Sequence, residues 1–207
     1  MRLKMGIAAL FIAAILLFLL CEFHESFDPT KARISVDYGP RLVGVAVSDC
    51  LNHVRPLITL TNNGKLVELS NQITDLARAQ GAKEFIVGLP VDSNGKVSYK
   101  VKNFNGQLCL NFSRVLCAVV NEKYPQGRVL LVDERYTTKA AKIKMKTENI
   151  KASLDAVAAA CLLERYIDDE GEGSIDAIPY EFPVPTNLAY FDYNLVKKYI
   201  REQYYED

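Results

Sequence analysis

The sequence predicts an α/β fold in which a mixed five-stranded sheet is flanked by helices. Segments with an apolar residue at every second position, or short continuous apolar runs, alternate along the chain with segments of helical periodicity. The first three expected strands follow one another directly. The later strands are each preceded by a helix, which favours crossovers into parallel pairing. The sheet should therefore contain both antiparallel and parallel neighbours.

The composition indicates one globular domain with an extension at each end. The chain has 207 residues, of which 49% are hydrophobic and 24% charged, a balance that excludes a disordered or collagen-like protein. Changes in composition divide it into residues 1–31, 32–169 and 170–207. The 25 basic residues balance 25 acidic ones, so any binding of nucleic acid must use a local patch. Five widely spaced cysteines indicate buried thiols of a reducing compartment rather than a disulfide framework or a zinc site.

The first segment is basic and then strongly hydrophobic. Arg2 and Lys4 precede an apolar run of 17 residues, Met5 to Cys21, which lies between the length of a signal-peptide core and that of a membrane span. A helix of a soluble domain would need a polar face here. We expect either a targeting signal or a retained anchor, the latter with membrane contact through residues 5–21. A buried core helix is a third alternative.

Residues 33–49 predict two strands joined by a turn. Ile34 and Val36 alternate with polar residues before Asp37, Gly39 interrupts the pattern, and an alternating apolar pattern resumes over residues 43–47. A carboxylate at such a strand end can face a metal ion or a phosphate group. The simpler interpretation is that Asp37 only starts a turn, for which Asp is a favoured residue.

The rest of the domain alternates strands and helices. A polar turn over residues 52–56 precedes a strand at 57–61, and an amphipathic helix over residues 66–77 is followed by Gly81, a typical residue after a helix end. A buried strand at 84–87 leads into Gly88, and a second helix extends from about residue 99 to 124. A further strand occupies 128–132, and Ser153 is typical of the residue that caps the next helix.

Three carboxylates occupy comparable places in this pattern. Asp37 and Glu134 stand at strand ends, and Asp155 lies in the first turn of a helix, where stabilisation by the helix dipole would also explain it. If the strands are neighbours, the three side chains converge. Carboxylate oxygens favour Mg²⁺ or Mn²⁺, and such ions can activate water for phosphodiester hydrolysis. Asp133 is an alternative ligand, but adjacent strand residues point to opposite faces, so only one of Asp133 and Glu134 should reach the site.

Two further segments carry features that the composition hides. Thr137 and Thr138 can cap a helix that carries a local basic patch, although each lysine could simply be a solvated surface residue. The patch comprises Lys139, Lys142, Lys144 and Lys146. From residue 170 onward glycine and proline mark a linker, and an apolar stripe over residues 188–200 has the spacing of an amphipathic helix that could dock on the core or on a partner.

Four segments together resemble the YqgF or RuvX group of Holliday junction resolvases and pre-16S rRNA nucleases. They occur in the order of that family and span roughly residues 32–168: Val36-Asp37-Tyr38-Gly39 through Gly44-Val45-Ala46-Val47-Ser48-Asp49, Ile86-Val87-Gly88-Leu89-Pro90, Leu131-Val132-Asp133-Glu134-Arg135-Tyr136-Thr137-Thr138, and Leu154-Asp155-Ala156-Val157-Ala158-Ala159.

The resemblance implies a ribonuclease H-like fold and a Mg²⁺- or Mn²⁺-dependent endonuclease. Its catalytic and metal-binding carboxylates would be Asp37, Glu134 and Asp155. The expected substrate is structured RNA, an rRNA precursor, with branched DNA as the second class, bound by a monomer or a homodimer. The residues expected to contact the substrate are Gly39, Arg41, Gly88, Arg135, Thr138, Lys139 and Lys142.

Two departures from the family pattern bear on activity. Leu42 and Val43 follow Arg41 where the family usually has a second basic residue, so one phosphate contact is missing. The segment between Thr138 and Asp155 is shorter than usual. Together with the neutral net charge, these departures leave open a nucleic-acid-binding protein that lacks catalysis. An actin-like ATPase is disfavoured, because about 140 core residues leave room for only one of the two domains it needs.

The hydrophobic start also bears on location. Bacterial members of the family are cytoplasmic, whereas this chain begins with a segment typical of targeting. We therefore expect import into an organelle, a plastid or a mitochondrion, with a membrane-anchored or a cytoplasmic protein as the alternatives.

Overall fold

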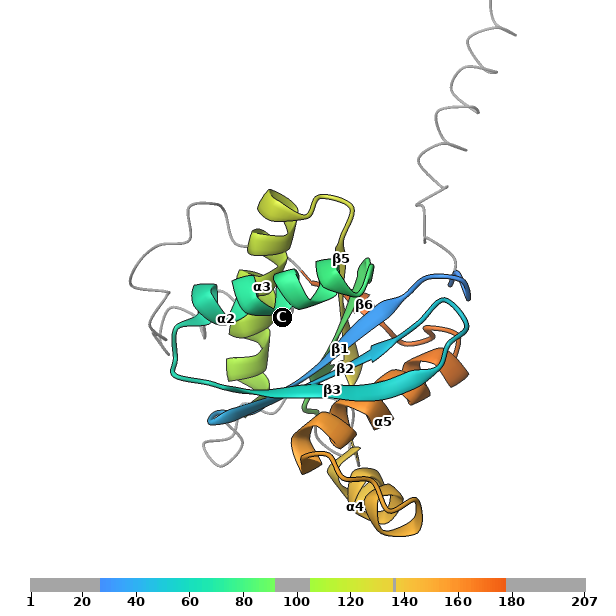
Figure 1. Cartoon of the computed structure of the whole chain (residues 1–207). Helices are drawn as coiled ribbons and strands as arrows, with labels where there is room; N and C mark the ends of the chain where they lie inside the picture. Colours follow the sequence, from blue (N-terminus) through green and yellow to red (C-terminus); the bar gives the residue numbers. More distant parts are fainter. Residues whose placement is uncertain (1–26, 92–104, 136, 178–207) are drawn as a thin grey trace, which may run out of the picture.

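A computed structural model describes residues 27–91, 105–135 and 137–177. Within them a mixed sheet separates two layers of helices (Figure 1). The elements in chain order are β1 (Arg33–Tyr38), β2 (Leu42–Ser48), β3 (Val54–Thr61), α2 (Leu66–Ala79), β4 (Glu84–Leu89), α3 (Asn105–Lys123), β5 (Arg128–Asp133), α4 (Thr137–Thr147), α5 (Leu154–Asp168) and β6 (Ile175–Asp176).

The strands lie in the order β3-β2-β1-β4-β5-β6. β1, β2 and β3 form an antiparallel meander, while β4 pairs parallel to both β1 and β5. The helices α2 and α3 come between β3 and β5 in sequence, so each provides the crossover that a parallel pair needs. This confirms the expected mixed α/β sheet flanked by helices, with β1 in its centre.

Two details of the predicted elements were wrong. The third strand begins at Val54, not at residue 57, because Pro56 lies on the edge strand β3, where no neighbour needs its missing N–H. A sixth strand, β6, was not predicted. It has only two residues and pairs antiparallel with β5, so its sequence is too short to show a period of two.

Alternation along β1 divides the core. Ile34 and Val36 pack with Ile73 of α2 and Phe112 of α3 on one face of the sheet. Ser35, between them, points to the other face and donates a hydrogen bond to the carbonyl of Ala159 in α5, over 2.7 Å. The layers in Figure 1 follow: α2 and α3 cover one face, and α5 covers the other with α4 packed outside it.

The helix ends follow the sequence signals. The Ser153 side chain caps α5 by accepting a hydrogen bond from the Ala156 N–H at 3.2 Å, as expected. Gly81 follows α2 with a φ of +68°, a conformation that glycine adopts without strain. α3 is described from Asn105, and the expected start of this helix near residue 99 lies outside the described residues.

Four cysteines lie in the described ranges and all are free thiols. Cys109 and Cys117 are buried, whereas Cys50 is exposed, contrary to the expectation of buried thiols. The hydrophobic run 5–21 and the apolar stripe at 188–200 lie outside the described residues. Of the helices within residues 27–177 that the structure describes, none is long and apolar enough to span a membrane.

Candidate active site

Asp37 stands near the end of the central strand β1 on the face that α5 covers. Ser35, two residues earlier, contacts α5, and a period of two places Asp37 on that same face. Its neighbour across the antiparallel pair is Gly44 of β2. The side chain of Asp37 is half-buried. The central strand thus holds this carboxylate at a fixed place between the sheet and the helix.

Asp155 reaches Asp37 because α5 crosses the sheet at a glycine. A Cβ atom on Gly44 would lie 2.0 Å from the backbone oxygen of Asp155 and 2.9 Å from the backbone nitrogen of Ala156. Those distances are far too short for real atoms, so only glycine lets the first turn of α5 lie against β2 here. Since Gly44 pairs with Asp37, this contact brings Asp155 beside Asp37.

Glu134 comes from the other side of β1. It follows the last residue of β5, and its backbone N–H donates to the carbonyl of Leu89 at the end of β4, over 3.2 Å. Its carboxylate folds back over Gly88: a Cβ on that glycine would lie 2.6 Å from Glu134 Oε2. β4 lies next to β1, so the fold carries Glu134 toward Asp37 from the side opposite to Asp155.

Burial and mutual repulsion make this a costly place for negative charge. Burial raises the pKa of Asp37 to about 6, and repulsion from Asp155 adds to the shift. Burial also raises the pKa of Glu134 to about 8, with further contributions from Asp37 and then Asp133. The Oε2 atom of Glu134 is buried with no hydrogen-bond partner in the structure. Buried oxygen atoms that repel one another are suited to a cation.

Asp133 and Glu134 point to different partners, as alternation predicts. Asp133 accepts hydrogen bonds from the backbone N–H of Arg135, at 2.8 Å, and from its Nε, at 2.7 Å. The guanidinium of Arg165 in α5 lies 3.9 Å from the same carboxylate. Asp133 is therefore neutralised by arginines, and Glu134 is the carboxylate that faces Asp37.

The three carboxylates fit a hard divalent cation in chemistry but do not form a finished cage. Their oxygen atoms are the ligands that Mg²⁺ and Mn²⁺ favour, and the unpartnered Oε2 of Glu134 could accept a metal bond. Among the described residues, however, no group of three or more Asp, Glu, His or Cys side chains is close enough together to hold a metal ion as it stands. A bound ion would have to draw the three side chains together.

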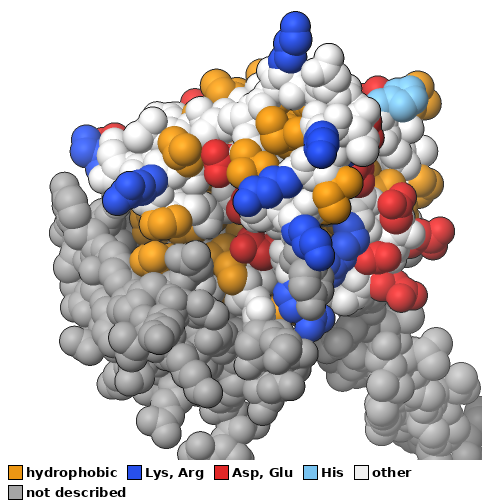
Figure 2. All heavy atoms as spheres, turned by 90° about the horizontal axis from the view of Figure 1, so that it is seen from below, with side chains coloured by type: hydrophobic (Ala, Val, Ile, Leu, Met, Phe, Trp, Pro, Cys, Tyr) orange, Lys and Arg blue, Asp and Glu red, His pale blue; other side chains and the backbone are white. Residues whose placement is uncertain are grey.

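The expected substrate contacts fall into two groups. Arg41 is exposed in the turn between β1 and β2, and Thr138, Lys139 and Lys142 are exposed on α4. Seen from the α4 side, Lys and Arg side chains gather near the middle of the surface, with Asp and Glu to one side (Figure 2). These residues are free to meet a phosphate backbone.

The other expected contacts have structural partners. Gly39 donates its N–H to the carbonyl of Leu42 at 3.0 Å and accepts from Asn62 Nδ2 at 2.9 Å, so the turn itself uses both of its backbone groups. Gly88 is buried in β4. Arg135 is bound to Asp133. Leu42, where the resemblance predicts a second basic residue, is 45% exposed and offers no charge.

Sequence reasoning did not recognise the part played by Gly44. A glycine inside a strand of valines indicates a close approach of another backbone, so the signal was present, but the approaching element could not be named. It also missed Cys109 of α3, whose Sγ donates to the carbonyl of Gly88 over 2.8 Å. A cysteine within an apolar helix carries no sign of such a contact.

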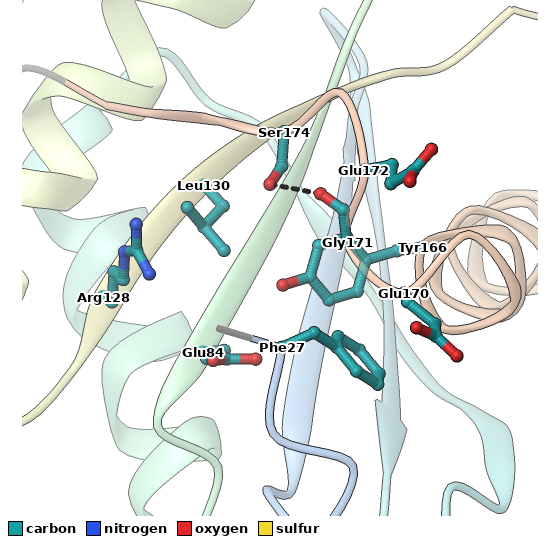
Figure 3. Close-up of a pocket in the computed structure, with 9 residues that line it drawn as sticks. All are labelled: Phe27, Glu84, Arg128, Leu130, Tyr166, Glu170, Gly171, Glu172 and Ser174. Atoms are coloured by element: carbon teal, nitrogen blue, oxygen red, sulfur yellow. Dashed lines mark hydrogen bonds between the residues drawn. The ribbon is translucent and has the colours of Figure 1, made fainter. Parts of the chain in front are cut away.

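Two cavities lie apart from the carboxylates. One of about 130 Å³ opens at the other end of the sheet, where β1 begins, and Figure 3 shows Glu84 and Tyr166 facing it. The second, of about 600 Å³, lies between α4 and α5 and is lined by Lys144, Cys161 and Glu164 among others. Neither contains Asp37, Glu134 or Asp155.

A family model and similar curated proteins point to the same family of nucleases. The family model described as "RuvX: Holliday junction resolvase" matches residues 31–169. Among similar curated proteins, one of Rickettsia rickettsii, named "Putative pre-16S rRNA nuclease", is 31% identical over 157 residues, which cover 72% of this chain and 94% of that protein. A protein of the same name from Malacoplasma penetrans is 29% identical over 141 residues, 65% of this chain and 92% of that protein.

One solved structure with a similar chain path is "T. thermophilus RuvC in complex with Holliday junction substrate". The match has a TM-score of 0.46 and 13% identity, and it covers 70% of this chain and 99% of that one. At that level of similarity, nothing about the chemistry of this chain follows from the match.

Proposed function

The chain belongs to the RuvX family, and from this premise we propose that it is a divalent-metal-dependent endonuclease that hydrolyses phosphodiester bonds in an rRNA precursor. The observation that carries the proposal is the convergence of Asp37, Glu134 and Asp155 on one face of the sheet, with Asp37 and Glu134 both half-buried and mutually repulsive. The choice of an rRNA precursor is supported by curated relatives of that name, whose length this chain covers almost completely.

Asp37, Glu134 and Asp155 would hold Mg²⁺ or Mn²⁺. When bound there, the ion supplies an activated water and stabilises the charge on the leaving oxygen. Asp37 lies between the other two carboxylates, so it is the side chain best placed to contact every ion in the site. With a pKa of about 8, the Glu134 carboxyl holds a proton at neutral pH, and this proton must leave before the oxygen can act as a ligand.

The exposed cations hold the substrate in this proposal. Arg41 stands on the turn that follows β1, and Lys139 and Lys142 extend from α4, which packs on α5 beside Asp155. Their contacts with phosphates would position the RNA without recognising its base sequence, as expected for an enzyme that recognises a folded RNA. Arg135 contributes less, because Asp133 already neutralises it.

The test is Mg²⁺-dependent cleavage of an rRNA precursor by the full chain and by Asp37→Asn. We expect the variant to lose at least about 100-fold in rate, because Asp37 is the side chain placed to contact every ion in the site. Asp49→Asn is the matched control, since Asp49 also follows a strand but is exposed and hydrogen-bonded to the backbone of its own turn. Equal activity in the wild type and Asp37→Asn would refute the assignment.

Two other functions have an observation in their favour. The description of the family favours a junction-resolving nuclease, so a four-way DNA junction belongs in the same assay. The exposed Leu42, which offers no charge to a phosphate, and the neutral net charge favour a nucleic-acid-binding protein without catalysis. Binding that is unaffected by EDTA and by Asp37→Asn, with no cleavage of either substrate, would identify it.

For the N-terminal segment we keep the proposal of import into an organelle. It is supported by the basic start and the apolar run 5–21, both outside the described residues. Sequencing the N-terminus of the mature protein decides the matter. A start near residue 30 indicates a removed signal, and an intact Met1 indicates a membrane anchor or a protein without a signal.

A further inference from the structure

Gly88 lies in the sheet between the strand that carries Asp37 and the strand that leads to Glu134. It follows Val87, whose partner in the parallel pair with β1 is Val36, the residue before Asp37. On its other side Gly88 pairs with Val132 of β5, two residues before Glu134. Gly88 is therefore next to Asp37 on one side and close to Glu134 on the other.

The backbone of Gly88 does not itself require glycine. The described glycines with positive φ are Gly64, Gly81, Gly171 and Gly173, so Gly88 has a backbone that other residues can adopt. What excludes a side chain is the neighbouring group. A Cβ there would lie 2.6 Å from Glu134 Oε2, 3.0 Å from Glu134 Cβ and 3.0 Å from Leu162 Cδ2.

β4 cannot easily move to relieve the steric overlap that a side chain at position 88 would cause. The carbonyl of Gly88 accepts the hydrogen bond of Cys109 Sγ from the α3 side, and β4 is paired with a strand on each edge. The most mobile of the three conflicting atoms is the far end of the Glu134 side chain. A methyl group at position 88 should therefore displace the carboxylate rather than the sheet.

We propose that Gly88 is a positioning residue whose missing side chain leaves the space in which the Glu134 carboxylate lies beside Asp37. This gives the glycine of the Ile86-Val87-Gly88-Leu89-Pro90 segment a role in setting the geometry of the acidic site. The direct substrate contact expected from the sequence stays a separate prediction. The consequence for metal binding rests on the proposed function. The steric part, that the missing side chain of Gly88 makes room for the Glu134 carboxylate, is independent of it.

The steric part is tested by a double-mutant cycle in EDTA, with thermal unfolding of the full chain as the readout. Gly88→Ala should lower the melting temperature by several degrees in the wild-type background. In the Glu134→Ala background, which lacks the carboxylate, the same substitution should cost clearly less. An equal loss in both backgrounds would show that the carboxylate does not fill the space at position 88, and the proposal would be wrong.

The positioning part is tested by titrating Mn²⁺ into each variant by calorimetry. Gly88→Ala should weaken the affinity for Mn²⁺ by about 10- to 100-fold, the usual effect of losing a group that orients a ligand. Adding Glu134→Asp withdraws the carboxylate by one methylene and should recover part of that affinity. Leu162→Val, which relieves only the apolar contact, should recover none when combined with Gly88→Ala.

The outcomes separate this proposal from the proposed function. Recovery by Leu162→Val but not by Glu134→Asp would assign Gly88 to core packing and overturn the positioning role. If the wild type neither binds Mn²⁺ nor cleaves nucleic acid, the nuclease proposal fails, yet the double-mutant cycle still decides whether Gly88 makes room for Glu134. Unchanged Mn²⁺ affinity in Gly88→Ala, with a wild type that does bind, would contradict the positioning role.

Discussion

At the scale of single residues, the charged forms of the carboxylates in the acidic site are energetically unfavourable. Asp37 and Glu134 are largely removed from water, face further carboxylates, and have pKa values of about 6 and about 8. Both values lie above those of the unfolded chain, so the folded protein binds these protons more tightly. Their contribution to stability is therefore fully present below about pH 4 and is lost as the pH rises toward 8.

The first prediction concerns this loss. In EDTA, Glu134→Gln should raise the free energy of unfolding relative to the wild type by on the order of 2 kcal/mol at pH 9, because glutamine cannot become charged. At pH 5, where Glu134 holds its proton, the two proteins should differ little. Urea denaturation at both pH values measures the difference. A gap of the same size at pH 5 and pH 9 would contradict the electrostatic explanation.

A second residue-scale feature lies at the opposite end of β1. The Arg33 side chain is fully buried, donates to Glu84 at 2.7 Å, and lies over the ring of Phe27 at 4.3 Å. Further donors of the guanidinium reach the carbonyl of Lys31 and the side chain of Asn52. A charge without water is stable only because each of these partners is in place.

We predict that Arg33→Met destabilises the protein by about 3 kcal/mol, because it removes the cation 2.7 Å from the buried Glu84 carboxylate and leaves Lys31 at 3.7 Å. The double variant Arg33→Met/Glu84→Gln should lose less than the sum of the two single changes. Lys65→Met is the control, since its partner Glu68 is exposed and such pairs contribute little. Losses of similar size for Arg33→Met and Lys65→Met in chemical denaturation would disprove this prediction.

At the scale of elements, the site depends on how closely α5 approaches β2. Backbone meets backbone at Gly44, and alanines of α5 continue the close contact along the sheet: Ala159 and Ala160 pack with Ala46. Small residues on both surfaces let the helix lie low enough for its first turn to carry Asp155 to the end of β1. A larger side chain anywhere on this line would raise the helix and separate the carboxylates.

The third prediction follows from that contact. Gly44→Ala should destabilise the fold by about 3 kcal/mol, since the methyl group conflicts with backbone atoms that cannot rotate away. Gly64→Ala is the control: its φ of +81° costs about 1 kcal/mol, and no atom lies within 4 Å of the added methyl group. Denaturant midpoints compare the two. A Gly44→Ala variant as stable as Gly64→Ala would show that α5 can shift freely.

At the scale of the whole molecule, the fold joins segments that are distant in sequence. β1, the end of β5 and the start of α5 supply one carboxylate each, and about 120 residues separate Asp37 from Asp155. A ligand that contacts all three must stabilise the folded chain as a unit, because the unfolded chain does not hold them together.

The fourth prediction is that Mg²⁺ raises the melting temperature of the wild type by several degrees at saturating concentration. At about 100 times its dissociation constant, a ligand specific to the folded state contributes about 2.7 kcal/mol. Asp37→Asn should show no such rise, although it should itself be more stable than the wild type in EDTA at pH 8, because asparagine removes the unfavourable charge of Asp37. An equal rise in both proteins, or an equal rise with NaCl at matched ionic strength, would exclude a specific site.

Much of the fold could be predicted because its signals are local. The alternation before Asp37, the stripe of α2 and the cap at Ser153 are each complete within a few residues, and each was confirmed. Pro56 and β6 were missed for a physical reason. Whether a proline is tolerated, and whether two residues form a strand, depends on the neighbouring strand and not on the segment itself.

The sequence by itself determined the order of strands and helices, the family, and which carboxylates stand at element ends, because hydrophobic period and motif order are properties of the chain. Only the tertiary structure decided which of these groups face one another. Gly44 and Gly88 lack side chains, and this leaves the space in which Asp155 and Glu134 lie on the two sides of Asp37. The sequence alone does not show which groups occupy that space. The distinction between Asp133 and Glu134 arises in the same way. The fold places Arg135 beside the Asp133 carboxylate and Asp37 near that of Glu134, and the sequence does not show either neighbour.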